Sequence, residues 1–359
     1  MQTHGDNQEV ITRKHVRKII YPIIIGLAVV VYMLQRELDV DLFDLITFTW
    51  YSAFWLSMAL LLMVVRDLGY IVRLKILTEG DFSWRQCFNV IMLWEFSSAI
   101  TPSAIGGTGV AIFFVNREGL SIGRSTAVVM ATSFLDELYF ILMFPLLLVI
   151  VTGRALFAID PGEEAISFTN EFFYFALIGY LAKFVFVLLI TYGLFVNPRG
   201  LKWLLLWIFR LPLIRKWRYK MHETGSDLIE TSRVFKTKPL GFWIKAFVAT
   251  FFSWTSRYWV VNFLLLAFFA VDGHILIFAR QLVMWIMMLV SPTPGGSGFA
   301  EFVFSRYLGE FIPEGIAVAV LMALIWRLVS YYPYLFIGAV MLPRWLSGKF
   351  TGTRGKEKK

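Results

Sequence analysis

Long apolar runs dominate the pattern of hydrophobic and polar positions along the chain. Six of these runs are long enough to cross a bilayer as helices, because a crossing takes about 20 apolar residues. The run at 45–65 contains no charged residue, 172–196 contains only Lys183, and 316–342 contains only Arg327. The pattern predicts an all-α, polytopic membrane protein with spans at residues 18–35, 45–65, 125–151, 172–196, 242–271 and 316–342.

Two further apolar stretches, 87–101 and 275–291, are shorter. Each stops at a cluster of proline and glycine after 15 to 17 residues. A helix of that length is roughly 22–26 Å long, which is less than a hydrocarbon core of about 30 Å. We therefore expect two re-entrant helical hairpins, at residues 87–118 and 275–308.

The charges between the runs support this arrangement. Residues 199–245 contain eleven Lys or Arg and three acids, whereas 36–44 and 153–171 each contain four acids and one Arg. Basic loops stay on the cytoplasmic side, and the basic segment 66–85 is expected to be one of them. If all eight stretches crossed the membrane, the basic N-terminal and central regions would fall on opposite faces. Six spans with two hairpins place every basic segment inside, including both termini.

The organisation that follows has one membrane domain between two basic tails. Residues 1–17 form a cytoplasmic N-terminus, 18–342 the transmembrane domain and 343–359 a cytoplasmic tail. The first span lacks a small-residue cleavage site, so we expect it to be retained. A basic cytoplasmic loop covers 197–242, and within it residues 201–220 mix Trp and Leu with Arg and Lys around a proline. That composition favours an interfacial helix over a solvated connector.

The tips of the two hairpins resemble each other. Residues 101–114 align with 291–303 when Ile105 is skipped, with six identities and three Ser/Thr exchanges over thirteen positions. Since the hairpins are expected to enter from opposite faces, the alignment predicts an inverted-topology repeat, with a site near the membrane midplane. The tip residues are Pro102, Gly106, Gly107 and Gly109 in the first copy, and Pro292, Pro294, Gly295, Gly296 and Gly298 in the second.

Such tips have a physical use. Proline removes a backbone donor and glycine adopts unusual angles, so the helix breaks there. A helix that restarts after Gly109 or Gly298 would present free N–H groups suited to an anionic headgroup. The alternative is that both tips are plain exposed loops, which a pair of related copies disfavours.

Composition excludes several classes of function. Of the residues, 58% are hydrophobic and 16% are charged, against about a quarter charged in soluble domains. The net charge of +9 lies in segments that flank apolar runs, so it indicates membrane orientation rather than nucleic-acid binding. Cys87 is the single cysteine, and the four histidines have no metal-binding spacing. We expect no metal and no cofactor.

Ionisable residues inside the spans are the candidate substrate-binding residues, because charge is costly in a membrane. Adjacent Asp136 and Glu137 point about 100° apart on a helix, so they cannot face one partner. Each of these residues could instead serve in a structural ion pair, and for Lys183 and Arg257 packing is the favoured interpretation. The candidates are Glu301, Arg327, Asp136, Glu137, Arg117 and Glu95.

These motifs resemble a known family. The segment Thr101-Pro-x-x-x-Gly-Gly with Asn116-Arg117-x-Gly119, and the segment Ser291-Pro-Thr-Pro-Gly-Gly-Ser-Gly-x-x-Glu301, resemble the transmembrane flippase half of lysylphosphatidylglycerol synthase/flippase proteins (the multiple peptide resistance factor family). Glu301 matches an acidic position of that family. The resemblance extends from about Lys18 to Leu342.

The resemblance implies movement of a phospholipid, classically an aminoacylated phosphatidylglycerol, between the leaflets of the bacterial cytoplasmic membrane. Full-length members carry an aminoacyl-transferase domain after the membrane region, whereas here a short basic tail follows Leu342. We therefore expect no enzyme activity. The expected partners are membrane phospholipid, a separate lipid-modifying enzyme and a second copy of the chain. The alternatives are a secondary transporter of a small polar solute or ion, and a membrane-embedded transferase.

Overall fold

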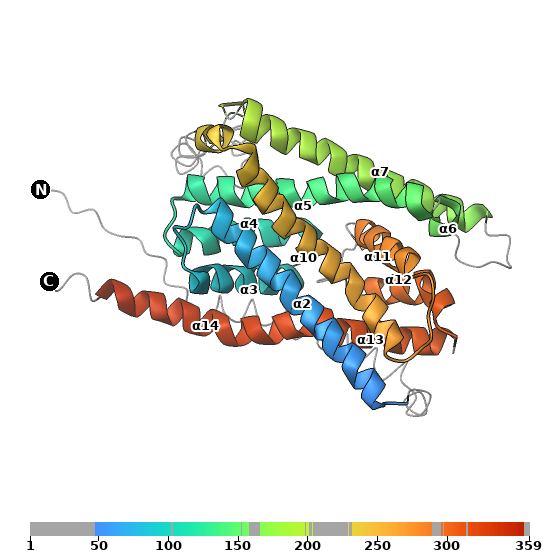
Figure 1. The fold of residues 1–359 in the computed structure, drawn as a ribbon. Coiled ribbons are helices and arrows are strands. Elements are labelled where there is room, and N and C mark those ends of the chain that lie inside the picture. The colour runs from blue at the N-terminus through green and yellow to red at the C-terminus, as the bar shows by residue number, and fades with distance from the viewer. Residues whose placement is uncertain are drawn as a thin grey trace, which may run out of the picture.

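The computed structural model describes residues 47–101, 103–151, 153–157, 166–197, 199–200, 203, 229, 232–288, 296, 298–313 and 315–354. Helices and the turns between them make up this part of the chain (Figure 1). The predicted first span, 18–35, and the interfacial segment 201–220 fall outside it, apart from Trp203.

The described helices occur in the following order along the chain. The first four are α2 (Trp50–Leu77), α3 (Trp84–Ile100), α4 (Ser103–Arg117) and α5 (Ile122–Val151). Next come the short α6 (Gly153–Phe157) and α7 (Ile166–Thr191), which continues into the π-helix η2 (Tyr192–Val196). The last are α10 (Leu240–Leu266), α11 (His274–Met288), α12 (Phe299–Tyr307), the 3-10 helix η4 (Gly309–Phe311), α13 (Ile316–Ser330) and α14 (Tyr332–Arg354).

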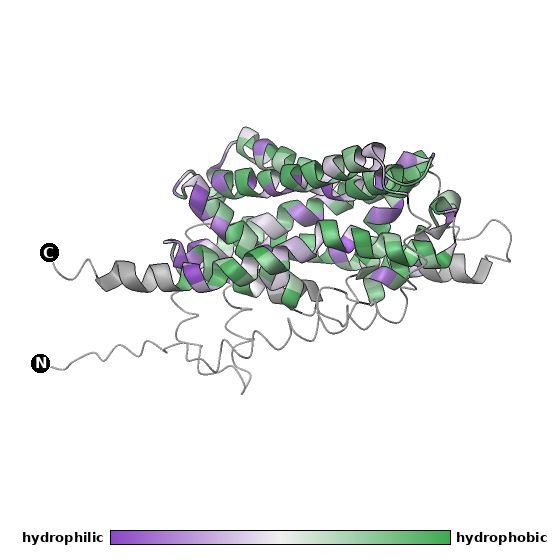
Figure 2. Cartoon of the chain, turned by 90° about the horizontal axis from the view of Figure 1, so that it is seen from below, coloured by the Kyte–Doolittle hydropathy of each residue, from purple (hydrophilic) through white to green (hydrophobic). Residues whose placement is uncertain are grey.

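Four of the described segments are long and apolar enough to span a membrane: Trp50–Leu77, Ile122–Val151, Ala176–Val196 and Ile316–Leu346. Hydrophobic residues, coloured green, predominate along the helices in Figure 2. This confirms a multi-pass, helical membrane protein. The predicted span 242–271 corresponds to α10, which has 27 residues but is not among these four apolar segments.

One predicted boundary is wrong. The segment 66–85 is not a basic loop throughout, because α2 continues as far as Leu77. The helix ends only at the turn where Glu79 and Gly80 adopt positive φ angles of 57° and 86°. Its arginines do not end the helix because they are paired inside the protein rather than solvated. The predicted span 316–342 lies within the apolar segment Ile316–Leu346, although α13 ends at Ser330 and α14 begins at Tyr332 within it.

Each predicted hairpin region contains a pair of short helices. The helices α3 and α4 have 17 and 15 residues, and α11 and α12 have 15 and 9. In Figure 1 the pair α3 and α4 lies toward one end of the bundle, and the pair α11 and α12 lies toward the other. None of these helices is long enough to cross a hydrocarbon core of about 30 Å alone.

The glycines of the two tips have different roles. In the first pair the helix restarts at Ser103, so Gly106, Gly107 and Gly109 lie within α4 rather than before it. Gly107 lets α4 approach α3, since a Cβ there would lie 2.1 Å from Ser98 Oγ. A glycine in a helix costs only about 1 kcal/mol relative to alanine. The close packing of α4 on α3 offsets this cost, so the helix continues through the glycines at which the sequence pattern predicts a break.

The second tip agrees better with expectation. Gly296 and Gly298 have φ angles of 70° and 84°, which favour glycine, and α12 begins directly after Gly298. The tip prolines Pro102, Pro292 and Pro294, together with Gly295, lie outside the described residues.

The helix α10 lies alongside α2 over much of its length (Figure 1). Gly69 on α2 makes this approach possible, because a Cβ there would lie 2.7 Å from both Ala249 O and Ser253 Oγ. Small residues at such a contact are typical of membrane helix packing. One face of the middle of α10 is buried, including Thr250, Ser253 and Trp254.

Candidate functional site

The interior of the bundle carries charge. Within the described part of the chain five cationic side chains are buried, and every one contacts a carboxylate. A buried charge costs several kcal/mol unless it is paired, so these pairs are expected of any charge at this depth. The pairs are Arg66 with Asp67 and Glu95, Arg73 with Asp136, Lys183 with Glu137, Arg280 with Glu310, and Arg327 with Glu301.

Asp136 and Glu137 on α5 face different neighbours, as adjacent helical positions require. Asp136 accepts two hydrogen bonds from Arg73 on α2 and one, at 2.6 Å, from the Trp254 indole on α10. Glu137 accepts from Lys183 on α7 at 2.7 and 2.9 Å. These two carboxylates therefore join α5 to three other helices.

Glu301 and Arg327, predicted together as substrate-binding residues, form one buried pair. Glu301 lies in the first turn of α12, where its Oε2 accepts from the Gly298 N–H at 2.7 Å. Its Oε1 accepts from Arg327 Nε at 2.8 Å. Both side chains are nearly inaccessible, with relative exposures of 3% and 5%. Glu301 thus caps the helix that restarts at the tip and neutralises an arginine from α13.

Some hydrogen-bond donors at and beside the Glu301–Arg327 pair are not used. Arg327 Nη2 and the Tyr332 hydroxyl are buried and have no hydrogen-bond partner within the described residues. The guanidinium of Arg327 also lies over the Tyr331 ring, 4.4 Å from its centroid. The pair is therefore neutral overall, but it retains hydrogen-bond donors that an anionic group could use.

The other two predicted site residues lie elsewhere. Glu95 on α3 pairs with Arg66, whose guanidinium lies between the Tyr70 and Tyr334 rings at 4.8 and 4.9 Å. Arg117 is exposed at the last position of α4. The structure thus places Glu95 in a separate cluster between α2, α3 and α14, and it does not bring Arg117 into the interior.

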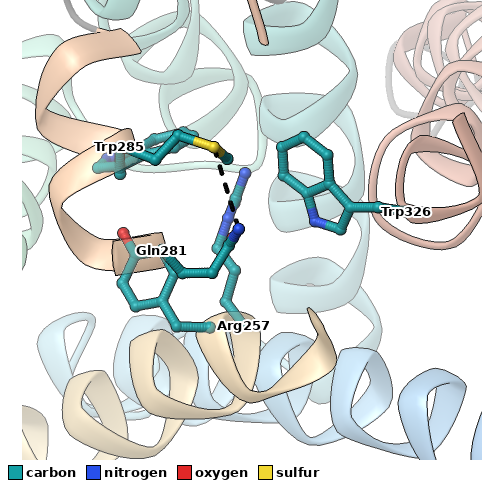
Figure 3. A pocket seen from close by; sticks show the side chains of 6 residues that line it. Arg257, Gln281, Trp285 and Trp326 are labelled. Carbon is teal, nitrogen blue, oxygen red and sulfur yellow. Dashed lines mark hydrogen bonds between the residues drawn. The ribbon is translucent and has the colours of Figure 1, made fainter. Parts of the chain in front are cut away.

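Arg257 on α10 differs from the five buried cations. No ion pair involves it in the described part of the chain. Its guanidinium lies over two indole rings, 5.5 Å from the Trp254 centroid and 4.4 Å from the Trp285 centroid. It also lines a cavity with Tyr258, Gln281, Met284, Trp285 and Trp326 (Figure 3).

Packing accounts for only part of the surroundings of this arginine. Arg257 is partly buried, and a cation–π contact contributes about 0.5–2 kcal/mol without using the N–H groups of the guanidinium. The cavity offers about 10 Å³ to the centre of a water molecule, which is close to the room that one water needs. We interpret Arg257 as a cation that can recruit a further partner.

The sequence reasoning assigned Arg257 to packing and therefore missed this cavity. One signal was available, because α10 contains no acidic residue from Leu240 to Leu266. A deep arginine on a helix without acids must find its partner on another helix or on a ligand. Gln281, Trp285 and Trp326 could not be grouped with it before the helices were arranged in space.

No metal centre is formed by the described residues, since no three His, Cys, Asp or Glu side chains come together there. The carboxylates named above are each held by a cation instead.

Comparison with known proteins gives the family. The profile described as "Lysylphosphatidylglycerol synthase TM region" matches residues 19–338. The chain belongs to this family. The match includes every described helix through α13 and the first turns of α14. The family resemblance indicated by the tip motifs is therefore confirmed, and it extends over nearly the whole chain.

A relative of this family also matches. A UPF0104 membrane protein of Archaeoglobus fulgidus is 27% identical over 298 residues, which cover 79% of this chain and 84% of that protein. No solved structure matches. The family and the apolar helices together establish a multi-pass membrane protein whose membrane region is of the lysylphosphatidylglycerol synthase type.

Proposed function

We propose that this chain translocates a phospholipid between the leaflets of the cytoplasmic membrane. The observation that carries the proposal is the Glu301–Arg327 pair, which lies buried where a broken helix restarts. Ionisable groups inside a membrane domain are by default functional candidates. Family membership supports the same conclusion, because the family is that of a phospholipid-related membrane region.

The pair can exchange partners without leaving a net buried charge. Arg327 presents a planar fork that suits a phosphate, and its Nη2 has no partner among the described residues. Glu301 suits an ammonium group. A headgroup with both charges could therefore separate the pair and satisfy each member. Aminoacylated phosphatidylglycerol has both charges, which makes it the preferred substrate class.

The arrangement of the helices fits this role. We propose that α3 with α4, and α11 with α12, are re-entrant pairs that form an inverted repeat, the second entering from the face opposite to the first. The beginning of α3 and the end of α14, which lie at the same end of the bundle (Figure 1), would face the cytoplasm. Arg85, Arg117 and Arg124 belong to the start of α3, the end of α4 and the start of α5, which gives this end a basic character. A separate lipid-modifying enzyme would supply the substrate, and this chain would perform no group transfer.

Vesicles containing the purified protein test the proposal. Phosphatidylglycerol and its lysyl derivative, both labelled on the headgroup, should become accessible to an external quencher without nucleotide. The same lipids in protein-free vesicles give the background rate. Accessibility at that background rate for every headgroup, with and without a proton gradient, would contradict the proposal.

The Glu301→Gln variant separates transport from helix capping. Gln keeps the shape and can still accept from Gly298, but it cannot balance Arg327 or an ammonium group. We expect loss of most translocation in the fraction that remains folded, with Arg327→Lys behaving similarly. The exposed Asp272, changed to Asn, is the control. If Glu301→Gln is less heat-stable yet fully active per folded molecule, its role is capping.

A secondary transporter of a small solute or ion is the second candidate. It is favoured by the small size of the cavity beside Arg257, which in this conformation accommodates about one water rather than a headgroup.

A further inference from the structure

The cavity beside Arg257 contains more donors than acceptors. Tyr258 lines this cavity, and its buried hydroxyl has no hydrogen-bond partner in the described part of the chain. Buried hydroxyls normally find a partner. An unsatisfied hydroxyl next to an arginine without an ion pair therefore indicates that a ligand is expected there.

Gln281 adds a third donor. It is also buried, and its Nε2 makes a long contact of 3.9 Å to Met284 Sδ (Figure 3). A thioether is a weak acceptor, so this amide remains available to a better one. Residues that carry guanidinium and amide N–H groups and a phenol O–H group thus line one cavity. An acceptor with several oxygens could use all three.

We propose that the cavity between α10, α11 and α13, which we call the Arg257 pocket, binds an oxyanion, namely the phosphate of an anionic phospholipid. This rests on the proposed function and deepens it by giving the phosphate a second binding place, distinct from Arg327. The Trp285 and Trp326 indoles, on either side of Arg257 in Figure 3, provide apolar faces for the glycerol that follows the phosphate. Their own N–H groups are further donors.

The pocket must widen to receive a phosphate, because its present volume is about that of one water. Met284 is the most adaptable part of the lining, since methionine is unbranched and flexible. Trp326 is immediately followed by Arg327 on α13. Displacement of α13 by a headgroup that engages Arg327 would therefore also move a wall of the Arg257 pocket.

Equilibrium binding in detergent tests the pocket independently of transport. The probe is dihexanoyl phosphatidylglycerol, and the readout is tryptophan fluorescence, to which Trp254, Trp285 and Trp326 contribute from beside Arg257. Dihexanoylglycerol, which has the same chains and no phosphate, should give no saturable change. Inorganic phosphate, as a second probe, tests whether a free oxyanion is sufficient for binding. Saturable binding of either phosphate-bearing probe supports the pocket.

The variants decide whether Arg257 is responsible. We expect Arg257→Gln to bind the phosphatidylglycerol at least tenfold more weakly, Arg257→Lys to recover part of the affinity, and the exposed Arg306→Gln to bind like the unmodified protein. If Arg257→Gln does not fold, Tyr258→Phe removes one donor at nearly constant volume and should weaken binding several-fold without changing the melting temperature. Unchanged binding in the folded variants, or no phosphate-dependent binding by the unmodified protein, overturns the proposal.

The result is distinguishable from a failure of the proposed function. Phosphate-dependent binding through Arg257 without any translocation in vesicles would retain the pocket and reject the flippase. Translocation with unchanged binding in Arg257→Gln would retain the flippase and reject the pocket.

Discussion

At the scale of single residues, the sequence identifies the deep charges but not their partners. Arg327 and Glu301 are predicted as one site because a headgroup needs both signs, and they do lie together at 2.8 Å. Arg66 and Arg73 fall in a predicted loop, whereas both are buried within α2. Their partners Glu95 and Asp136 lie on other helices, and no local pattern in a sequence reports such contacts.

The Arg73–Asp136 pair should be a major source of stability. In Asp136→Asn, Arg73 loses its ionic partner while the carboxamide keeps the shape. Breaking a buried pair costs about 3–5 kcal/mol, so we expect a large fall in melting temperature in detergent.

The control for this change is the exposed pair of Asp81 with Arg124, whose side chains are 50% and 33% accessible. Asp81→Asn should cost at most about 1 kcal/mol, as surface pairs do. Equal destabilisation by the two substitutions would show that the interior pair is solvated rather than buried.

At the scale of helices, the apolar runs predict positions well and ends less well. The starts of α2 and α3 carry capping boxes, Thr49 with Ser52 and Ser83 with Gln86, and these motifs can be read from sequence. The extension of α2 beyond residue 65 cannot be predicted from the sequence. Its arginines would suit a solvated loop equally well, and only their buried partners show that they belong to the helix. Helix breaks do fall within the two predicted hairpin regions, but the first helix restarts before its glycines rather than after them.

The contact between α2 and α10 gives a prediction at this scale. Gly69→Ala should destabilise the protein, because the new Cβ would lie 2.7 Å from the backbone oxygen of Ala249. In an open helix the same change usually stabilises by up to about 1 kcal/mol. The melting temperature in detergent measures the difference.

Gly241 is such an open position on α10, since a Cβ added there would have no other atom within 4 Å. Gly241→Ala should leave the melting temperature equal or higher. A Gly69→Ala variant that is as stable as Gly241→Ala would mean that α2 and α10 do not approach each other so closely.

At the scale of the whole molecule, the charge pattern predicts the orientation of the two short helix pairs. Arg85 lies in the first turn of α3 at one end of the bundle, and Asp272 precedes α11 at the other (Figure 1). After replacement of the buried Cys87, single cysteines at Arg85 and Asp272 should react with an impermeant reagent from opposite faces, with Arg85 on the cytoplasmic side. Labelling of both from one face would contradict the inverted repeat.

The helical, multi-pass character of the protein is predictable, because the length of its apolar runs is a property of the chain itself. The Arg257 pocket is not predictable, since it needs Tyr258 on α10, Gln281 on α11 and Trp326 on α13 to meet in space. A substrate site formed by contributions from several helices becomes visible only once their packing is known.

The central claim is that the moving molecule is a lipid and not its water-soluble headgroup. The most direct measurement uses vesicles that contain the purified protein, a headgroup-labelled phosphatidylglycerol and trapped radiolabelled glycerophosphoglycerol, with no nucleotide. We predict that the lipid label becomes accessible to an external quencher well above the protein-free rate while the trapped solute stays inside. Efflux of the solute with the lipid label still protected would contradict the claim and identify a solute transporter.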